Sequence, residues 1–346
     1  MNSPPTRILI VLPCCIGDVV LATAALMALR RAYPTAHIAW AVGGWSKGVL
    51  QDHPALDALV DTGPAALPTR SLGGLLRFVR QMRVGHYDLL VSLVRSPTMS
   101  VAALLSGIPI RAGIDSAGRG FGYTIRAAAD PQTPRHEAEI YLDVVRALGV
   151  ETSGCRAFIP VPNSERDFPA RHGLTRPYLV VNPAGGRNPG MTMDSKRYPP
   201  AQMAALAERL AARLDTQIVL LGGPNDGDIL AAVAAALGNV PAAVFSGGLH
   251  FGQIGALAAG ARLYLGNDTG LTHLAAAAGA KTVMIMGPSD PTRYAPYAAD
   301  AIAVWQPTRV SSRGVAAGTP LDFDWARDGI SVEAAQTQII EWVGAD

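Results

Sequence analysis

A polar cluster near the C-terminal end of the chain carries the residue types best suited to bind an anion. Residues 266–273 read Gly-Asn-Asp-Thr-Gly-Leu-Thr-His, after the apolar run 263–265 and before an Ala-rich segment that favours a helix. The N–H groups at a helix N-terminus lack intrahelical partners and carry partial positive charge, so this turn suits a phosphate. Alternatively, Asp268 or Thr269 only caps the helix, and the turn by itself leaves both interpretations open.

A carboxylate follows the first apolar run of the chain. The run 7–12 leads into Pro-Cys-Cys-Ile-Gly-Asp, and Asp18 then opens a helical pattern. At the mouth of a sheet this carboxylate is placed to accept a proton from a substrate hydroxyl, although an ordinary helix N-cap explains it equally simply. The turn lacks the G-x-G-x-x-G pattern, so a hydride-transferring NAD enzyme is disfavoured.

The turn over residues 183–199 is long, Gly-rich at first and then basic. Such a loop can fold over an anionic ligand. It contains Gly186, and Lys196 and Arg197 are its candidates for neutralising a leaving phosphate. No P-loop pattern occurs here, so ATP hydrolysis of that type is not indicated.

Asp226 comes just after the apolar run 217–222. A carboxylate at the end of a Rossmann-type strand can hold both hydroxyls of a ribose, and Asp226 is the first choice for that role. Asp-x-Asp patterns at 226–228 and 322–324 resemble metal sites of some glycosyltransferases, but we interpret them as turn or helix-cap residues.

Several arginines are spread over a Gly-rich stretch of the first half. If their side chains converge, they would suit an anionic acceptor, and the alternative is that each is a solvated surface residue. The stretch contains Arg111, Arg119, Arg126 and Arg135, with His136 following.

A scaffold of alternating strands and helices must position these residues. Apolar runs alternate with helical patterns along the chain, which predicts an α/β fold with parallel sheets covered by helices on both faces. The 346 residues suit two Rossmann-like halves, whose facing strand ends create a cleft. The predicted domains are 1–165 and 178–330, joined by a linker at 166–177 and followed by a C-terminal helix at 331–346 for which packing back on the N-terminal domain is left open.

Composition narrows the class of protein. A formal net charge of +2 does not favour a nucleic-acid binder. No apolar run approaches the roughly 20 residues that cross a bilayer, and the first residues lack signal-peptide features, so we expect a soluble cytoplasmic protein. The three cysteines, Cys14, Cys15 and Cys155, show no metal-ligand spacing, and we expect reduced thiols.

Several short motifs, taken in order, resemble the bacterial heptosyltransferase family, glycosyltransferase family 9. The resemblance covers almost the whole chain. It rests on residues 7–11 and 16–20, the Lys-Arg-Tyr-Pro segment at 196–199, the Gly-Gly-Pro at 222–224, residues 266–273, and the Met-Gly-Pro-Ser-Asp-Pro at 286–291.

This resemblance implies a GT-B architecture of two facing Rossmann-like domains. It implies inverting, metal-independent transfer of a heptose from ADP-heptose to a lipopolysaccharide inner-core-type acceptor, with no cofactor beyond the ADP-sugar as co-substrate. Carried over by position, Asp18 is the general base and Lys196 the cation on the donor phosphates. The donor-binding set is Asp268, Thr269, Gly270, Leu271, His273, Asp226, Gly248, Leu249 and Gly186, with Gly248 and Leu249 at the adenine.

The expected partners are the nucleotide-sugar donor and an anionic glycolipid acceptor, which Arg111, Arg119 and Arg126 would contact. We expect no nucleic acid, and the resemblance leaves room for peripheral contact with the inner face of the cytoplasmic membrane. The oligomeric state stays open.

Two departures from the family's pattern concern the sugar and the acceptor. Cys14 and Cys15 stand where many relatives carry small polar residues, and the loop 185–194 differs as well. Three alternatives therefore stay open: a glycosyltransferase of the same fold that uses another nucleotide sugar on a glycolipid or small molecule, a non-catalytic nucleotide-sugar-binding protein, and an epimerase of the same architecture.

Overall fold

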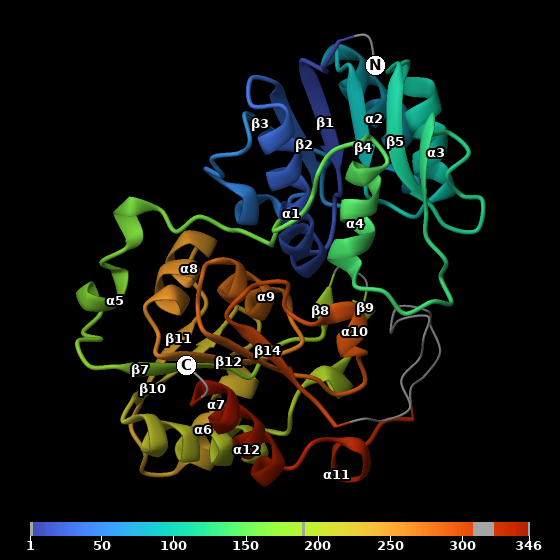
Figure 1. Ribbon diagram of the computed structural model, residues 1–346. Coiled ribbons are helices and arrows are strands. Elements are labelled where there is room, and N and C mark those ends of the chain that lie inside the picture. Colours follow the sequence, from blue (N-terminus) through green and yellow to red (C-terminus); the bar gives the residue numbers. More distant parts are fainter. Residues whose placement is uncertain (1–2, 189–190, 307–321, 345–346) are drawn as a thin grey trace. The chain divides into compact units, whose positions relative to one another are not determined.

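The computed structural model describes residues 3–188, 191–306 and 322–344 (Figure 1). The chain divides into two compact units, Met1–Ile159 and Pro160–Asp346, so the division falls earlier than the predicted boundary at 165. The predicted linker belongs to the second unit and contains helix α5 (Phe168–Arg171). Phe168 is buried, and the centre of its ring lies 4.1 Å from that of His172. These contacts hold in place a segment whose polar composition indicated a linker.

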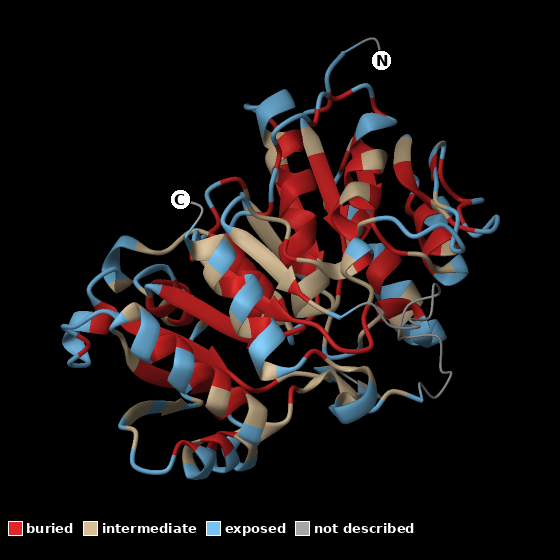
Figure 2. Ribbon diagram, turned by 60° about the horizontal axis from the view of Figure 1, so that its bottom comes forward, coloured by how far each residue is buried: buried red, intermediate tan, exposed pale blue. Residues whose placement is uncertain are grey.

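The first unit is built on a parallel six-stranded sheet in the order β3-β2-β1-β4-β5-β6. Its strands are short apolar runs, and those of β1, β2 and β4 are almost wholly buried (Figure 2). The strands are β1 (Arg7–Val11), β2 (His37–Val42), β3 (Ala58–Asp61), β4 (Leu89–Ser92), β5 (Ile110–Asp115) and β6 (Ile125–Ala128).

Four longer helices cover this sheet. They are α1 (Ile16–Ala32), α2 (Leu72–Val84), α3 (Pro97–Ser106) and α4 (Glu137–Arg146). Helix α1 packs against α4, and α2 packs against α3. The crossovers that contain α1 and α2 run in opposite directions along the sheet, and right-handed crossovers then place these helices on opposite faces. The unit therefore has three layers, with α1 and α4 forming one helical layer.

The second unit repeats this plan. Its parallel sheet has the order β11-β10-β7-β12-β13-β14, and a two-stranded hairpin of β8 (Arg187–Asn188) and β9 (Met191–Thr192) lies in the loop after β7. The sheet strands are β7 (Tyr178–Asn182), β10 (Gln217–Gly222), β11 (Ala242–Ser246), β12 (Leu263–Asn267), β13 (Thr282–Ile285) and β14 (Ala301–Val304). Both units are thus doubly wound α/β folds, as the sequence predicts.

The remaining helices of the second unit pack on this sheet. They are α6 (Pro200–Leu214), α7 (Gly227–Leu237), α8 (Phe251–Ala259), α9 (Gly270–Ala277), α10 (Pro291–Tyr294), α11 (Trp325–Asp328) and α12 (Val332–Val343). The C-terminal helix α12 packs against α6, and Ala335 and Ile339 on it are fully buried in the core of this unit. These apolar contacts make α12 an integral part of the second unit.

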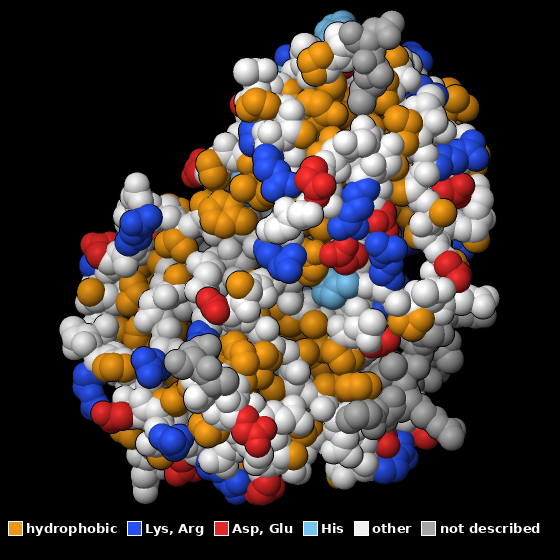
Figure 3. All heavy atoms as spheres, viewed as in Figure 1, with side chains coloured by type: hydrophobic (Ala, Val, Ile, Leu, Met, Phe, Trp, Pro, Cys, Tyr) orange, Lys and Arg blue, Asp and Glu red, His pale blue; other side chains and the backbone are white. Residues whose placement is uncertain are grey.

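The surface is of mixed charge. On the face shown in Figure 3, Lys and Arg side chains are interspersed with Asp and Glu side chains, in keeping with the formal net charge of +2. Within the described part of the chain, no helix is both long enough and apolar enough to cross a membrane.

Candidate active site

Asp18 lies at the carboxyl end of the first sheet, where β1 leads into α1. Helix α1 begins at Ile16 with Cys15 as its N-cap, so Asp18 is the third helical residue and the sequence placed the helix start too late. Its Oδ2 accepts a hydrogen bond from the Cys15 N–H at 3.4 Å, and its Oδ1 accepts one from the Tyr141 hydroxyl at 2.9 Å. The carboxylate therefore supports the helix end and also belongs to a side-chain network.

That network is buried against helix α4. Tyr141 and Glu137 on α4 are each 2 % exposed, and the Glu137 carboxylate binds the Arg95 guanidinium at 2.6 Å. Burial and the negative charge of Glu137 raise the pKa of Asp18, while the Tyr141 bond, the Cys15 N–H and the positive charge of Arg95 act against that rise. A carboxylate whose pKa lies above its ordinary value is a stronger base, as proton abstraction from a hydroxyl requires.

The neighbouring cysteines correct a prediction. Cys14 and Cys15 form a disulfide between adjacent residues, whereas the sequence indicated reduced thiols because no spaced cysteine pair is present. Cys155 is free and buried, in keeping with the prediction for that residue.

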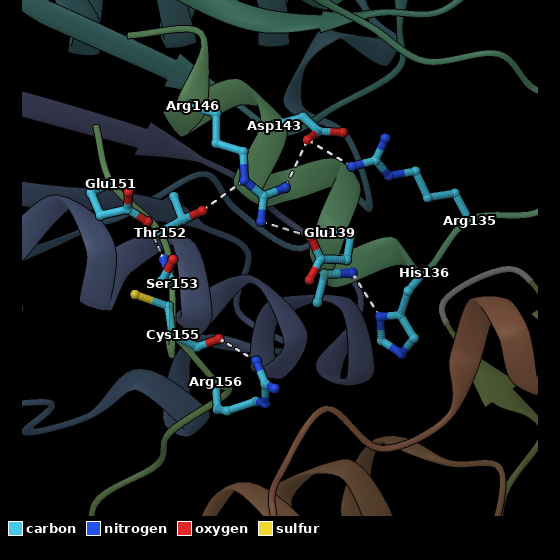
Figure 4. Close-up of polar contacts among 11 residues, drawn as sticks. Arg135, His136, Glu139, Asp143, Arg146, Glu151, Thr152, Ser153, Cys155 and Arg156 are labelled. Atoms are coloured by element: carbon cyan, nitrogen blue, oxygen red, sulfur yellow. Dashed lines mark hydrogen bonds and ion pairs between the residues drawn. The ribbon is translucent and has the colours of Figure 1, made fainter. Parts of the chain in front are cut away.

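Three of the arginines in the Gly-rich stretch have polar partners within the first unit. Arg111 lies at the amino end of β5, and its Nε donates to the Gly122 carbonyl at 2.9 Å. Arg126 lies 4.0 Å from the Asp115 carboxylate. The Arg135 guanidinium points toward Asp143 of α4 and binds it at 2.8 Å (Figure 4). Each of these three side chains stabilises its own neighbourhood.

Arg119 is the exception among them. It is exposed in the loop between β5 and β6, and no hydrogen bond or ion pair involves its guanidinium in the part of the chain that the structure describes. It stays a candidate for contact with an anionic acceptor.

In the second unit, Lys196 of the loop after β7 forms an ion pair with Asp268, which follows β12. The Lys196 Nζ lies 2.6 Å from Asp268 Oδ2, and the two side chains are only 17 % and 7 % exposed. Burial is the largest influence on Asp268 and opposes its ionisation. The positive charges of Lys196 and His273, together with hydrogen bonds from Lys196 and Ser289, nevertheless lower the pKa of that carboxyl. Arg197 instead binds Asp194 at 2.8 Å, so Lys196 is the cation of this loop that faces β12.

The polar residues at the start of α9 do not cap the helix with their side chains. Thr269 occupies the N-cap position of α9, but its side chain makes no capping hydrogen bond, and the Asp268 carboxylate is bound to Lys196. The N–H groups of Gly270 and Leu271, in the first turn, have no intrahelical acceptor. Both residues are half-buried, whereas His273 is buried one turn further on. The helix thus presents an uncapped N-terminus, as an anion site requires.

Asn267 is a residue that the sequence interpretation passed over. It is fully buried at the end of β12. Its amide Nδ2 donates to the Pro183 and Ala184 carbonyls at 2.8 and 3.2 Å, and its Oδ1 accepts from the Tyr198 N–H at 3.0 Å. One side chain thereby holds both ends of the loop 183–198 beside the α9 turn. A buried asparagine beside Asp268 in a polar motif was the signal that could have revealed it.

Gly186 shapes the middle of this loop. Its φ is +71°, and a Cβ at this position would lie 2.1 Å from the Met193 carbonyl oxygen. The Met193 N–H in turn donates to the Gly186 carbonyl at 2.6 Å, which closes the loop. The pair Pro189 and Gly190 of the same loop lies outside the described residues.

Asp226 and residues 248–249 follow neighbouring strands, β10 and β11. The Gly247 N–H donates to the Gly222 carbonyl at 3.0 Å, so the two strand ends are joined. Asp226 is half-buried, and its Oδ2 accepts from the Gly223 N–H at 2.8 Å, which is a turn role. Gly248 is exposed and Leu249 half-buried. Within residues 3–188, 191–306 and 322–344, no group of three or more His, Cys, Asp or Glu side chains could hold a metal ion.

Strand order singles out two places where a ligand can bind. In a doubly wound sheet, ligands bind beyond the carboxyl ends of the strands, where the strand order reverses. The reversal falls between β1 and β4 in the first unit and between β7 and β12 in the second. Asp18 and Arg95 follow the first two strands, and Lys196 and Asp268 follow the second two. Arg95 could have been found by this rule, but Tyr141 and Glu137 lie too far along the chain.

The fold is the two-unit α/β architecture of the GT-B class. At the strand reversal of the first unit lies the half-buried carboxylate of Asp18, and at that of the second unit lies the Lys196–Asp268 ion pair beside the start of α9. The profile of glycosyltransferase family 9 (heptosyltransferase) matches residues 75–320. The chain belongs to glycosyltransferase family 9 and is a glycosyltransferase.

Similar proteins agree with this membership. "Lipopolysaccharide heptosyltransferase 3" of Escherichia coli is 23% identical over 298 residues, which cover 84% of this chain and 86% of the relative. The crystal structure of a glycosyl transferase family 9 protein from Veillonella parvula superposes with a TM-score of 0.80 at 25% identity, over 99% of this chain and 98% of the other. The structure of E. coli ADP-heptose lipopolysaccharide heptosyltransferase II gives a TM-score of 0.76 at 21% identity, over 98% and 99%.

Proposed function

We propose that the chain transfers a heptose from ADP-heptose to a lipopolysaccharide inner-core-type acceptor, with inversion and without a metal ion. Family membership supports the transfer chemistry, and the names of the relatives support the sugar and the acceptor class. The observation that carries the proposal is that each unit has a charged side chain suited to this chemistry at its point of strand reversal, a carboxylate with a raised pKa in the first unit and a largely buried lysine in the second. Asp18 is the base and Lys196 the cation.

Asp18 acts on the acceptor. Its carboxylate takes the proton of the acceptor hydroxyl, and the acceptor oxygen attacks the anomeric carbon as the bond from that carbon to the ADP oxygen breaks. A single in-line displacement inverts the anomeric configuration. The Tyr141 hydroxyl orients the Asp18 carboxylate, and burial with the charge of Glu137 keeps the pKa of that carboxylate raised.

Lys196 and the α9 turn act on the leaving group. The ADP gains negative charge as the glycosidic bond breaks, and a cation with fixed N–H donors stabilises that charge more in the transition state than in the ground state. Asp268 holds Lys196 beside the turn, and the N–H groups of Gly270 and Leu271 complete the cradle. These groups supply the positive charge that a divalent metal provides in other enzymes.

The test combines binding with turnover. Asp18→Asn should keep ADP binding and lose transfer by about 10²–10⁴-fold, the usual contribution of a general base. Asp130→Asn, which changes an exposed carboxylate of the same unit, should transfer at the wild-type rate. Undiminished transfer by Asp18→Asn removes the base role from that residue.

A second measurement tests the donor. Thermal shifts with ADP, UDP, GDP and their sugars should be largest for the ADP series. A clear preference for UDP would contradict the proposed donor and favour another nucleotide sugar. Consumption of a nucleotide sugar with no acceptor present would favour an epimerase.

A further inference from the structure

The outer surface of helices α2 and α3 is exposed, apolar and basic. Of the nine large hydrophobic side chains that are exposed among the described residues, five belong to these two helices. Leu72 is 72%, Val84 68% and Leu76 56% exposed on α2, and Leu104 and Leu105 are 54% and 41% exposed on α3. We call this surface, together with Arg70, Arg77, Arg80 and Arg83, the α2–α3 face.

The charge on the α2–α3 face has one sign. Neither residues 62–87 nor residues 93–114 contain an Asp or a Glu. Arg70, Arg77 and Arg80 are exposed, and in the described part of the chain no ion pair or hydrogen bond involves their side chains. The face therefore carries unneutralised positive charge, unlike the mixed surface around it.

Helix geometry gathers these side chains. At about 100° per residue, Leu72, Leu76, Arg80 and Val84 of α2 fall within a single arc that also contains Arg77 and Arg83. The opposite side of the helix, with Phe78, Val79 and Met82, is buried. The Arg83 guanidinium donates to the Leu105 carbonyl at 2.7 and 3.1 Å and joins the two helices into one surface.

We propose that the α2–α3 face docks the protein on an anionic lipid bilayer. A helical surface with arginines on one side and leucines beside them has the composition of interfacial membrane-binding helices. The leucine side chains would enter the boundary between headgroups and acyl chains, while the arginines contact lipid phosphates. The same face of a second copy does not pair with it, because like charges would meet. The proposal does not depend on the transfer reaction, since docking requires no donor or acceptor.

The experiment measures partitioning of the full chain to lipid vesicles by co-sedimentation. We expect binding to phosphatidylglycerol-containing vesicles, weaker binding to pure phosphatidylcholine, and loss of the difference at high salt. Each arginine near an anionic surface contributes about 1 kcal/mol, or about fivefold in partitioning, so Arg77→Glu/Arg80→Glu should lose at least about 30-fold. Leu72→Ser/Leu76→Ser should lose about tenfold and keep its salt dependence.

The matched control changes the same charge elsewhere. Arg166→Glu/Arg213→Glu alters exposed arginines of the second unit by the same net charge and should bind vesicles as the wild type does. All variants change exposed side chains, and their thermal melts should match the wild type. Absence of vesicle binding by the wild type at low salt, or an equal loss in the control, overturns the proposal. Retained binding by Leu72→Ser/Leu76→Ser and Arg77→Glu/Arg80→Glu overturns it as well, and would leave this face to an acidic protein partner.

Discussion

The Tyr141 hydroxyl offers the sharpest test of the carboxylate network, because its removal deletes one oxygen atom. Tyr141→Phe leaves the buried ring in place and removes the O–H that donates to Asp18 Oδ1 at 2.9 Å. Burial and the charge of Glu137 already disfavour the ionised form of Asp18, and this hydrogen bond opposes them. Without it, the pKa of Asp18 must rise further.

The size of the pKa change follows from the energy of the Tyr141–Asp18 hydrogen bond. A hydrogen bond to a charged group contributes about 1.5–3 kcal/mol, and about 1.36 kcal/mol corresponds to one pKa unit. A protonated carboxyl still accepts a weaker hydrogen bond, so only about half of that energy favours the ionised form of Asp18 over the protonated form. The pKa of Asp18 should therefore rise by about one unit when the bond is removed. The base works only when deprotonated. The acid limb of the kcat/KM profile of Tyr141→Phe therefore lies about one pH unit above that of the wild type. At pH values below both limbs, kcat/KM of the variant is about tenfold lower than that of the wild type, and above both limbs the two values converge.

The assay is the pH dependence of kcat/KM for transfer, which reports the titration of the free enzyme. Tyr178→Phe is the control, because it removes a buried tyrosine hydroxyl that donates to the Leu257 carbonyl at 2.9 Å in the second unit. Its acid limb should stay at the wild-type position. An unmoved limb in folded Tyr141→Phe would refute the reasoning, since either Asp18 is not the titrating base or the bond does not tune it.

Three further changes test the same two sites. Glu137→Gln removes a negative neighbour of the base, so the acid limb of the same profile should move down by about one unit. Gly266→Ala puts a Cβ 2.4 Å from the Thr272 hydroxyl oxygen. Overpacking of this kind costs about 1–3 kcal/mol of stability, so the Tm should fall. Adding Thr272→Ala removes the clashing hydroxyl and should restore part of the lost Tm. Asp268→Asn removes the negative partner of the buried Lys196 ammonium. Breaking such a pair lowers the free energy of unfolding by about 3–5 kcal/mol. ADP should then raise the Tm of Asp268→Asn more than that of the wild type, because its phosphates replace the lost charge; an equal shift would place the phosphates elsewhere.

Much of the fold could be predicted because its strands are short apolar runs between turn residues. Strand β10 has the bounds of the apolar run 217–222, β1 fills all but the last residue of the run 7–12, and β12 extends the run 263–265 by two residues. Strands β5 and β6 were not predicted, because arginine and glycine interrupt their apolar character and left the stretch without a periodic pattern. Their place in the sheet comes from pairing with β4, a long-range contact that local composition does not encode.

The candidate site divides in the same way. The polar turns at Asp18 and Asp268 were predictable, because each follows an apolar run and opens a helix. Their partners were not. Tyr141 lies 123 residues from Asp18, and Lys196 was a candidate cation whose contact with Asp268 spans 72 residues. A side chain on a distant helix contributes only after folding, so sequence pattern gives the candidates and tertiary packing selects among them.

In the proposed mechanism, the two units use the same structural element for opposite electrostatic tasks. In each, a short turn leads from a strand at the point of strand reversal into a helix, whose N-terminus carries partial positive charge. In the first unit that charge falls on Asp18, which the helix end and Tyr141 stabilise against burial and Glu137, so the carboxylate stays ionisable and basic. In the second unit the Lys196 ammonium takes the carboxylate that could have capped the helix, and the N–H groups stay open. A helix cap and an anion site are thus two uses of the same geometry. The difference is that Asp18 accepts a hydrogen bond from its own helix end, whereas Asp268 is bound to Lys196.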